Sequence, residues 1–364
     1  MKRLLKGATL YGQFIKAEKM PAFCRQHLDN GHFPAWERKI LEFILDFLDP
    51  AETILQKSSG TTGISKEMEI SKEAMIRSAM LTTAALDLQK NQLALLCLPV
   101  DYIAGKMMIV RALVTGMNLV WIEPSALPVV PAKDAVDFCA MVPLQVVNLL
   151  ERRYDFSYIK TLIVGGSSIS AGLENQIKTL PCHIYETFGM AETCSHIALR
   201  RINGPYAKSW FTVLPGIKIS TDDRRCLVIR APFLPFPVVT NDVVEITGKR
   251  TFHWKGRFDH VINSGGIKIN PEELEKTIVA VLGHELVVVG CPDDKLGQKP
   301  VMVTTHPYSE AEKLLTLKKL KTILPAYHAP ADIISMDSMP RNRAFKIDRK
   351  KLSETLAEKM KKNR

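Results

Sequence analysis

The 364-residue sequence lacks paired cysteines at metal-ligand spacing, a long apolar run and an aromatic-studded basic motif. Its seven cysteines are scattered and odd in number, which argues against a disulfide framework or a zinc site and indicates reduced thiols. No run approaches the roughly 18 apolar residues that a membrane helix needs. Residues 1–20 also lack the continuous apolar core of a signal peptide. We therefore expect a soluble, cytoplasmic protein.

The chain carries a formal net charge of +11, but much of the excess lies in residues 341–364. No zinc-finger spacing or RNA-binding motif accompanies this basic tail, so the charge favours a solvated helix and anionic small-molecule ligands over nucleic acid. At this length a single core usually stops growing, and two domains are expected.

A short polar segment, Ser58-Ser59-Gly60-Thr61-Thr62-Gly63-Ile64-Ser65-Lys66, has the composition of an anion-binding loop. Its glycines permit close backbone approach, its hydroxyls donate hydrogen bonds, and its lysine adds a mobile positive charge. The P-loop pattern fails because Ser65 precedes Lys66 and Glu67 follows it. The segment predicts a polyphosphate site, with a flexible polar turn as the alternative.

Apolar runs of strand length alternate with helical patterns, which predicts an α/β fold with a substantially parallel sheet. Strands are expected at 53–57, 93–99, 118–122, 135–142, 161–164 and 183–186, and helices at 36–48, 71–88, 106–115, 143–153 and 171–180. Prolines after residue 198 indicate a β-rich subdomain. A second α/β unit follows residue 257, with a hairpin at 261–269, a helix capped by Asn270, a strand at 286–290 and a lysine-rich helix at 310–324.

Polar or glycine-containing turns follow three of the predicted strands. They are residues 98–105, 165–168 and 187–193. Ligands of open parallel sheets gather at the carboxyl ends of strands, so these turns are candidates for one binding edge. Ordinary strand–helix connections are the alternative.

Five segments in order resemble the motifs of the adenylate-forming enzymes, which include acyl- and aryl-CoA synthetases. They are Gly60-Thr61-Thr62-Gly63, Phe188-Gly189-Met190-Ala191-Glu192, Asn241-Asp242, the stretch from Gly256-Arg257 to Glu275, and Pro340 to Arg349. Ala191 and Phe345 stand where the family usually has Thr and Gly. The region before the first motif is much shorter than is usual in the family. Within the family, residues 98–111 are similar to the o-succinylbenzoate–CoA ligases of menaquinone synthesis, with Tyr102 in place of the usual His.

The resemblance implies a two-step ligase that uses ATP, Mg²⁺ and coenzyme A. A carboxylate, here 2-succinylbenzoate, is first converted to an acyl-adenylate with release of pyrophosphate, and CoA then displaces AMP. Another acyl or aryl acid ligase, an enzyme that loads a carrier protein, and a non-catalytic nucleotide-binding relative stay open as alternatives. A homodimer is also left open, because a short N-terminal region leaves surface for a second subunit to cover.

The resemblance also implies residue roles. Lys346 and Glu192 are the expected catalytic residues, Lys346 bridging the carboxylate and the α-phosphate and Glu192 ligating the metal. The nucleotide residues are Ser58, Ser59, Gly60, Thr61, Thr62, Gly63, Lys66, Gly166, Ser167, Glu186, Thr187, Phe188, Gly189, Met190, Ala191, Asp242 and Arg257. The acyl residues are Tyr102, Arg111, Gly165 and Gly189, and Gly265 and Gly266 line the CoA path.

Two domains are implied, an N-terminal adenylation domain over residues 1–256 and a mobile C-terminal domain over residues 257–364. The C-terminal domain is expected to rotate about Asp259 between the two half-reactions. Arg111 is the specificity candidate, because an arginine can pair bidentately with a second substrate carboxylate. A structural ion pair is the alternative for Arg111.

Overall fold

The computed structural model describes residues 4–57, 67–130, 135–341 and 347–362. The chain forms two compact units. Unit 1 comprises residues 1–169, 177–218 and 230–238, and unit 2 comprises residues 170–176, 219–229 and 239–364. The boundary expected after residue 256 stays a prediction.

Unit 1 is built on a mixed sheet whose strands lie in the order β11-β10-β9-β8-β7-β5-β6-β1-β2. Strands β1, β6, β5, β7, β8 and β9 run parallel, and β2, β10 and β11 are antiparallel to their neighbours. The strands are β1 Gly7–Leu10, β2 Gln13–Lys16, β5 Leu93–Leu96, β6 Asn118–Trp121, β7 Val136–Met141, β8 Ile159–Val164, β9 His183–Gly189, β10 His196–Arg201 and β11 Phe211–Val213. The predicted α/β fold with a largely parallel sheet is confirmed.

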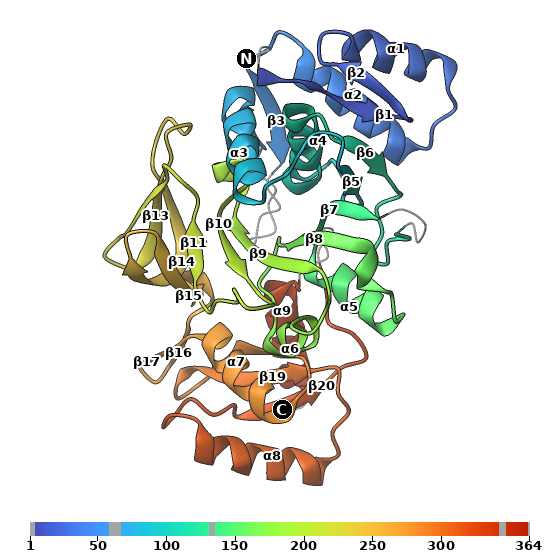
Figure 1. The fold of residues 1–364 in the computed structure, drawn as a ribbon. Helices are drawn as coiled ribbons and strands as arrows, with labels where there is room; N and C mark the ends of the chain where they lie inside the picture. Colours follow the sequence, from blue (N-terminus) through green and yellow to red (C-terminus); the bar gives the residue numbers. More distant parts are fainter. Residues whose placement is uncertain (1–3, 58–66, 131–134, 342–346, 363–364) are drawn as a thin grey trace. The chain divides into compact units, whose positions relative to one another are not determined.

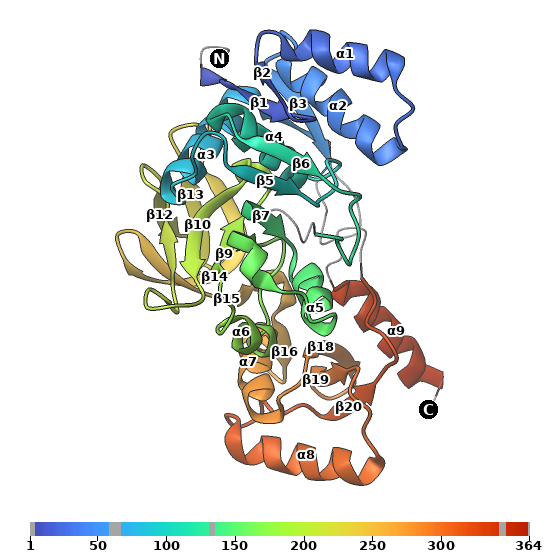
Figure 2. The ribbon, with the colours of Figure 1, turned by 45° about the vertical axis from the view of Figure 1, so that its right-hand side comes forward.

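The helices of unit 1 are α1 Met20–Asn30, α2 Ala35–Leu48, α3 Lys72–Ala85, α4 Ile103–Thr115 and α5 Pro143–Glu151. Helix α4 packs on β1, β5 and β6 and against α3, while α1 and α2 lie side by side (Figures 1 and 2). The amphipathic pattern of α2 buries Ile40, Ile44 and Phe47, and the helix ends before Pro50 as expected. Ser71 caps α3 by accepting a hydrogen bond from the Ala74 N–H at 3.3 Å.

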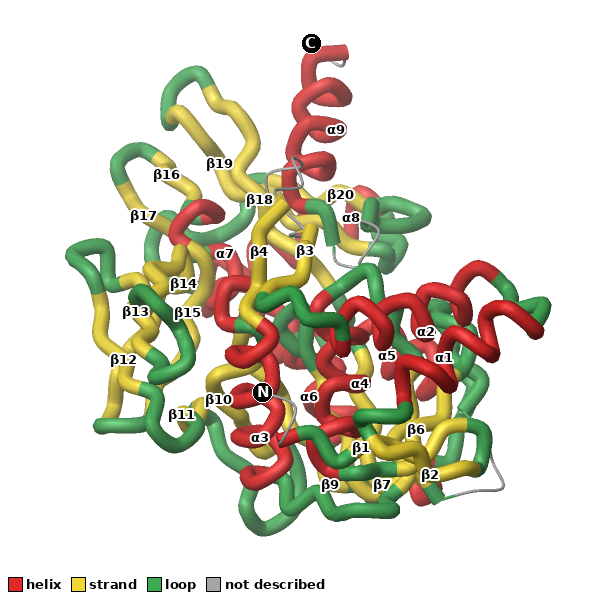
Figure 3. The backbone as a smooth tube through the Cα atoms, turned by 90° about the horizontal axis from the view of Figure 1, so that it is seen from above, coloured by secondary structure: helices red, strands yellow, loops and turns green. Residues whose placement is uncertain are grey.

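A separate pair of antiparallel strands belongs to unit 1, β3 Thr53–Lys57 and β4 Glu67–Ser71 (Figure 3). Lys57 pairs with Glu67, so the two ends of the predicted phosphate loop are held next to each other. Residues 58–66 themselves lie outside the described residues.

Unit 2 contains two groups of strands. The first has the order β12-β13-β14-β15, with β12 Lys218–Thr221, β13 Cys226–Arg230, β14 Val238–Gly248 and β15 Thr251–Arg257. The second is β17-β16-β19-β18 with β20 beside β19, formed by β16 Ile262–Ser264, β17 Ile267–Ile269, β18 Leu286–Asp293, β19 Gly297–Thr304 and β20 Asp332–Ser335. Its helices are α6 Ala171–Ile177, α7 Pro271–Leu282, α8 Glu310–Ile323 and α9 Arg349–Lys362.

Strand β18 is buried on both faces because its side chains alternate between two cores. Leu286 and Val288 pack with α7 and α8, whereas Val287 and Val289 pack with α9 (Figure 2). Because both faces of β18 are buried, residues 286–290 form a continuous apolar run rather than an alternating one.

Two local expectations are wrong. The strand expected to end at Glu186 continues to Gly189, because β10 pairs with it antiparallel from Tyr185 to Gly189. Asn270 precedes α7 as expected, but its side chain makes no capping hydrogen bond. Among the described residues, no helix is long and apolar enough to cross a membrane.

Candidate active site

The turn after β8 and the side chains of β9 form one part of the candidate site in unit 1. A Cβ on Gly165 would lie 2.0 Å from Thr187 Oγ1, so only glycine fits beside this threonine. Gly166 has φ +86°, a left-handed conformation that also favours glycine. Ser167 is exposed beside it. The structure thus brings Gly165, Gly166, Ser167 and Thr187 to one edge of the parallel sheet.

Glu186 is buried, and both of its carboxylate oxygens have partners inside the protein. Oε1 accepts the Ile169 N–H at 2.9 Å, and Oε2 accepts Nε and Nη2 of Arg200 at 2.8 and 2.7 Å. Arg200 lies opposite Glu186 on β10. Glu186 therefore fixes the turn after β8, a positioning function that the sequence reading missed because Arg200 belongs to no motif.

The motif Phe188 to Glu192 spans the end of β9 and a 3₁₀ turn at Ala191–Thr193. A Cβ on Gly189 would approach His196 Cα and Ser195 O to 2.3 Å, so the close passage of β10 requires this glycine. Thr193 Oγ1 accepts the Met190 N–H at 3.1 Å and donates to Ser195 O at 2.7 Å, which fixes the turn.

Glu192 is exposed on this turn, and its carboxylate makes no hydrogen bond or ion pair with the described residues. Mg²⁺ in nucleotide enzymes is commonly bound through one or two carboxylates together with substrate phosphates. A free carboxylate at the end of the sheet fits this requirement. Within the described residues, no group of three acidic, histidine or cysteine side chains is placed to hold a metal ion by itself. A metal at Glu192 would therefore need further ligands, such as substrate phosphates.

Arg111 projects from the middle of α4, and its side chain is only 2% exposed. Nη2 donates to Ser195 Oγ at 2.6 Å, Nη1 reaches Met108 Sδ at 3.8 Å, and Nε has no partner among the described residues. Burial lowers the pKa of Arg111 to about 9, so the group is still charged at neutral pH. In the part of the chain that the structure describes, no carboxylate pairs with it, so the ion pair expected as the alternative is not found there.

The neighbours of Arg111 are neutral hydrogen-bonding groups. His196 is buried and shares a 3.0 Å hydrogen bond between Nε2 and Thr82 Oγ1. Burial and, second, the charge of Arg111 hold the pKa of His196 well below its ordinary value, so its imidazole is uncharged. Ser195 and His196 were missed by the sequence reading, although they follow the Glu192 motif directly.

Tyr102 is the residue before α4, in the loop that follows β5. A Cβ on Gly105 would come within 2.3 Å of Pro99 O, so this glycine lets α4 begin against the loop. Residues 98–101 also line a cavity of about 460 Å³ with the start of α2 and Glu123.

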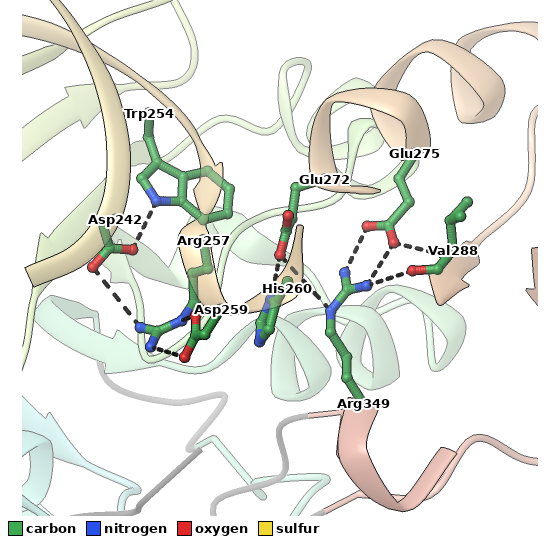
Figure 4. A network of polar contacts seen from close by, with 9 residues as sticks. All are labelled: Asp242, Trp254, Arg257, Asp259, His260, Glu272, Glu275, Val288 and Arg349. Carbon is green, nitrogen blue, oxygen red and sulfur yellow. Dashed lines mark hydrogen bonds and ion pairs between the residues drawn. The ribbon is translucent and has the colours of Figure 1, made fainter. Parts of the chain in front are cut away.

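Asp242 and Arg257 face each other on β14 and β15 in unit 2 (Figure 4). Asp242 is buried, with Oδ1 accepting Trp254 Nε1–H at 2.9 Å and Oδ2 lying 3.9 Å from Arg257 Nη1. Burial raises the pKa of Asp242, while Trp254 and Arg257 oppose the rise. The two residues expected to bind the ribose are thus brought together.

Arg257 also holds Asp259, the predicted pivot, with Nε–Oδ1 and Nη2–Oδ2 distances of 2.9 and 2.8 Å (Figure 4). Burial acts to lower the pKa of Arg257, but Asp259 and Asp242 outweigh it and raise the pKa. The bond to Asp259 was not predicted.

The predicted CoA hairpin is present as β16 and β17, with Gly265 and Gly266 at φ +58° and +85°. Two successive left-handed residues are typical of a tight hairpin turn. Lys346 lies outside the described residues; Arg341 and Ile347, which flank its segment, form an antiparallel bridge.

Comparison with known proteins finds similarity in both sequence and fold. A sequence model described as AMP-binding enzyme matches residues 49–225. The 2-succinylbenzoate–CoA ligase of Lactococcus lactis is 24% identical over 84% of this chain and 72% of its own, and that of Oceanobacillus iheyensis is 26% identical over 81% and 68%.

Two solved structures extend the comparison. The o-succinylbenzoate CoA synthetase of Bacillus subtilis, in complex with its acyl-adenylate intermediate, is 20% identical with a TM-score of 0.68. The match covers 92% of this chain and 80% of its own. An acyl-CoA synthetase (AMP-forming)/AMP-acid ligase II-like protein of Dyadobacter fermentans is 33% identical, with a TM-score of 0.60, over 93% of this chain and 98% of its own. With this identity over nearly the whole of both chains, the present chain belongs to the family of AMP-binding, adenylate-forming enzymes.

Proposed function

We propose that the chain is an AMP-forming acid–thiol ligase that acts on an acid with two carboxylates, 2-succinylbenzoate. The acid would attack the α-phosphorus of ATP to give an acyl-adenylate and pyrophosphate, and the thiol of CoA would then displace AMP. The family membership and the names of the curated relatives support the reaction. The observation that carries the substrate is the buried charge of Arg111, beside which no carboxylate lies among the described residues.

The first half-reaction joins an anionic nucleophile to an anionic phosphate and expels an anion, so alignment and charge neutralisation dominate catalysis. Lys346 is proposed to bridge the two reacting groups, and residues 58–66 to hold the departing phosphates. Glu192 would hold Mg²⁺, which neutralises phosphate charge when bound. Its carboxylate is exposed and has no partner in the part of the chain that the structure describes, which supports this assignment.

The Asp242–Arg257 pair is proposed to hold the ribose. Oδ2 of Asp242 makes no hydrogen bond to Arg257 at 3.9 Å, so it can accept one from a sugar hydroxyl. Trp254 fixes the other oxygen and with it the orientation of the carboxylate. Arg257 opposes the rise that burial causes in the pKa of Asp242 and so favours the ionised carboxylate.

Arg111 is proposed to bind the second carboxylate of the acid. Burying an unpaired cation is unfavourable, and a bound carboxylate would supply both the missing charge and an acceptor for Nε. Ser195 orients the guanidinium, and the uncharged His196 adds no competing charge. A monocarboxylic acid would leave the arginine unpaired.

The proposal also includes a cytoplasmic location. All seven cysteines are free and buried, which suits a reducing compartment. Light scattering after size-exclusion chromatography would decide between a monomer and the homodimer that the sequence leaves open.

Magnesium-dependent ATP–pyrophosphate exchange with a panel of acids tests the proposal. The panel pairs 2-succinylbenzoate with 4-oxo-4-phenylbutanoate and 2-butanoylbenzoate, each of which lacks one of its two carboxylates. We expect exchange with the dicarboxylate and at least tenfold less with either analogue. Equal exchange with an analogue would indicate a different acyl or aryl acid ligase, and no exchange with any acid would favour a non-catalytic relative. Product analysis with CoA and with a carrier protein then separates the two thiol acceptors.

A further inference from the structure

The 3₁₀ turn Phe258–His260 joins β15 to β16 and contains Asp259, the predicted pivot. None of its three residues is buried, so apolar packing does not hold it in place. Polar contacts do this instead, and they fall on two sides of Asp259.

On the N-terminal side, Arg257 binds Asp259 within the turn, and the Arg224 guanidinium lies 5.2 Å from the centre of the Phe258 ring. On the C-terminal side, His260 Nδ1 lies 2.5 Å from Glu272 Oε1 in the first turn of α7 (Figure 4). Among the hydrogen bonds and ion pairs of the described residues, this one connects a side chain of the turn to α7.

Glu272 is well fixed as the acceptor of this bond. Its side chain is 6% exposed and belongs to the first turn of α7, where the helix dipole favours a negative charge. Burial acts to raise the pKa of Glu272, but the hydrogen bond from His260 and the charge of Arg349 outweigh it and hold the pKa below its ordinary value. The group is therefore a carboxylate at neutral pH and requires a donor from His260.

We infer that His260 is a positioning residue: by donating Nδ1–H to Glu272 it fastens the C-terminal side of the 258–260 turn to α7. The functional part of the inference rests on the proposed function, because the turn matters for turnover only if the chain pivots at Asp259. With His260 fastened, dihedral change is confined to residues 257–259.

Hydrogen exchange at the Val261 amide tests the attachment without any substrate. This N–H closes the turn by donating to Phe258 O at 3.3 Å. His260→Ala removes the donor to Glu272 and is expected to lower protection of this amide about fivefold or more, as the loss of one hydrogen bond to a charged group implies. His260→Asn keeps a donor near the Nδ1 position and should retain most of the protection.

His328→Ala is the matched control, since its ring contacts only the nearby Ala326 carbonyl among the described residues and its loss should leave protection at Val261 unchanged. Wild-type protection in His260→Ala, or an equal loss in His260→Asn, would overturn the attachment.

Steady-state kinetics then test its role in turnover. His260→Ala is expected to lower kcat for acyl-CoA formation about threefold or more, with KM for the acid unchanged, and His260→Asn to restore most of it. An unchanged kcat would refute the role in turnover. Absence of pyrophosphate exchange with every acid would instead refute the proposed function. The hydrogen-exchange result at Val261 would then still decide whether His260 attaches the turn to α7.

Discussion

Two arginines, one buried in unit 1 and one half-buried in unit 2, have opposite surroundings. Arg111 in unit 1 has a serine hydroxyl and a thioether around its guanidinium and no carboxylate among the described residues, and burial lowers its pKa to about 9. Arg349 in unit 2 holds Glu275 bidentately at 2.7 and 2.8 Å and the Val288 carbonyl at 3.0 Å. Burial acts to lower the pKa of Arg349 too, but Glu275 and Glu272 outweigh it and raise the pKa.

The difference separates an arginine whose charge is balanced within unit 2 from one that has no counter-charge among the described residues. Arg349 ties α9 to α7 and β18, and its charge is already balanced. In the described part of the chain the charge of Arg111 has no partner of opposite sign, which an interior site tolerates only with a counter-charge from elsewhere. The same substitution at the two positions should therefore have different consequences.

Replacement of Arg349 by methionine should give the largest effect on stability. Glu275, whose side chain is 14% exposed, would be left without its bidentate partner, and loss of a hydrogen bond to a charged group costs about 1.5–3 kcal/mol. Chemical denaturation followed by hydrogen exchange in β18 and α9 would measure the loss. A change below about 1 kcal/mol would contradict the contrast with Arg111.

Replacement of Lys346 by alanine should give the next largest effect, confined to the first half-reaction. We expect pyrophosphate exchange to fall by about a hundredfold or more, because a cation at the reacting phosphate is lost, and thioester formation from a supplied acyl-adenylate to persist. Lys350→Ala is the control, since Lys350 is exposed on α9. Equal loss in both half-reactions would contradict the assigned role.

Replacement of Arg111 by methionine should raise KM for 2-succinylbenzoate about tenfold to a hundredfold, the cost of one lost charge-assisted pair. The free energy of unfolding should stay the same or rise, because an unpaired buried charge is removed. Arg111→Met and Arg349→Met thus form a matched pair measured by the same denaturation. An unchanged KM together with a large loss of stability would show that Arg111 is structural.

The smallest predicted effect contrasts the beginnings of two helices. Ser71→Ala should reduce stability in unit 1 by about 1 kcal/mol, because it removes the cap on the Ala74 N–H. Asn270→Ala should not remove a cap in unit 2, since the Asn270 side chain makes none. Thermal unfolding of both variants, with local hydrogen exchange at α3 and α7, measures the two changes in stability. An equal loss of stability in the two variants would contradict the prediction.

Much of the fold could be predicted because its signals are local. The apolar stripe of α2, the cap at Ser71 and the paired glycines at 265 and 266 each depend on residues a few positions apart. The order of motifs placed Asp242 and Arg257 in one site, and the structure brings them together. Family and fold followed from the same short segments.

The partners of those residues could not be predicted, because each contact joins segments far apart in the chain. Strand β9 runs on to Gly189 only because β10 returns beside it, and Glu186 meets Arg200 for the same reason. Arg111 reaches Ser195, 84 residues away, and Arg349 reaches Glu275 across 74. The sequence by itself determined which chemical groups the protein carries, whereas the tertiary structure decided which charges find a counter-charge among the described residues, because the partners come from segments far apart in the chain.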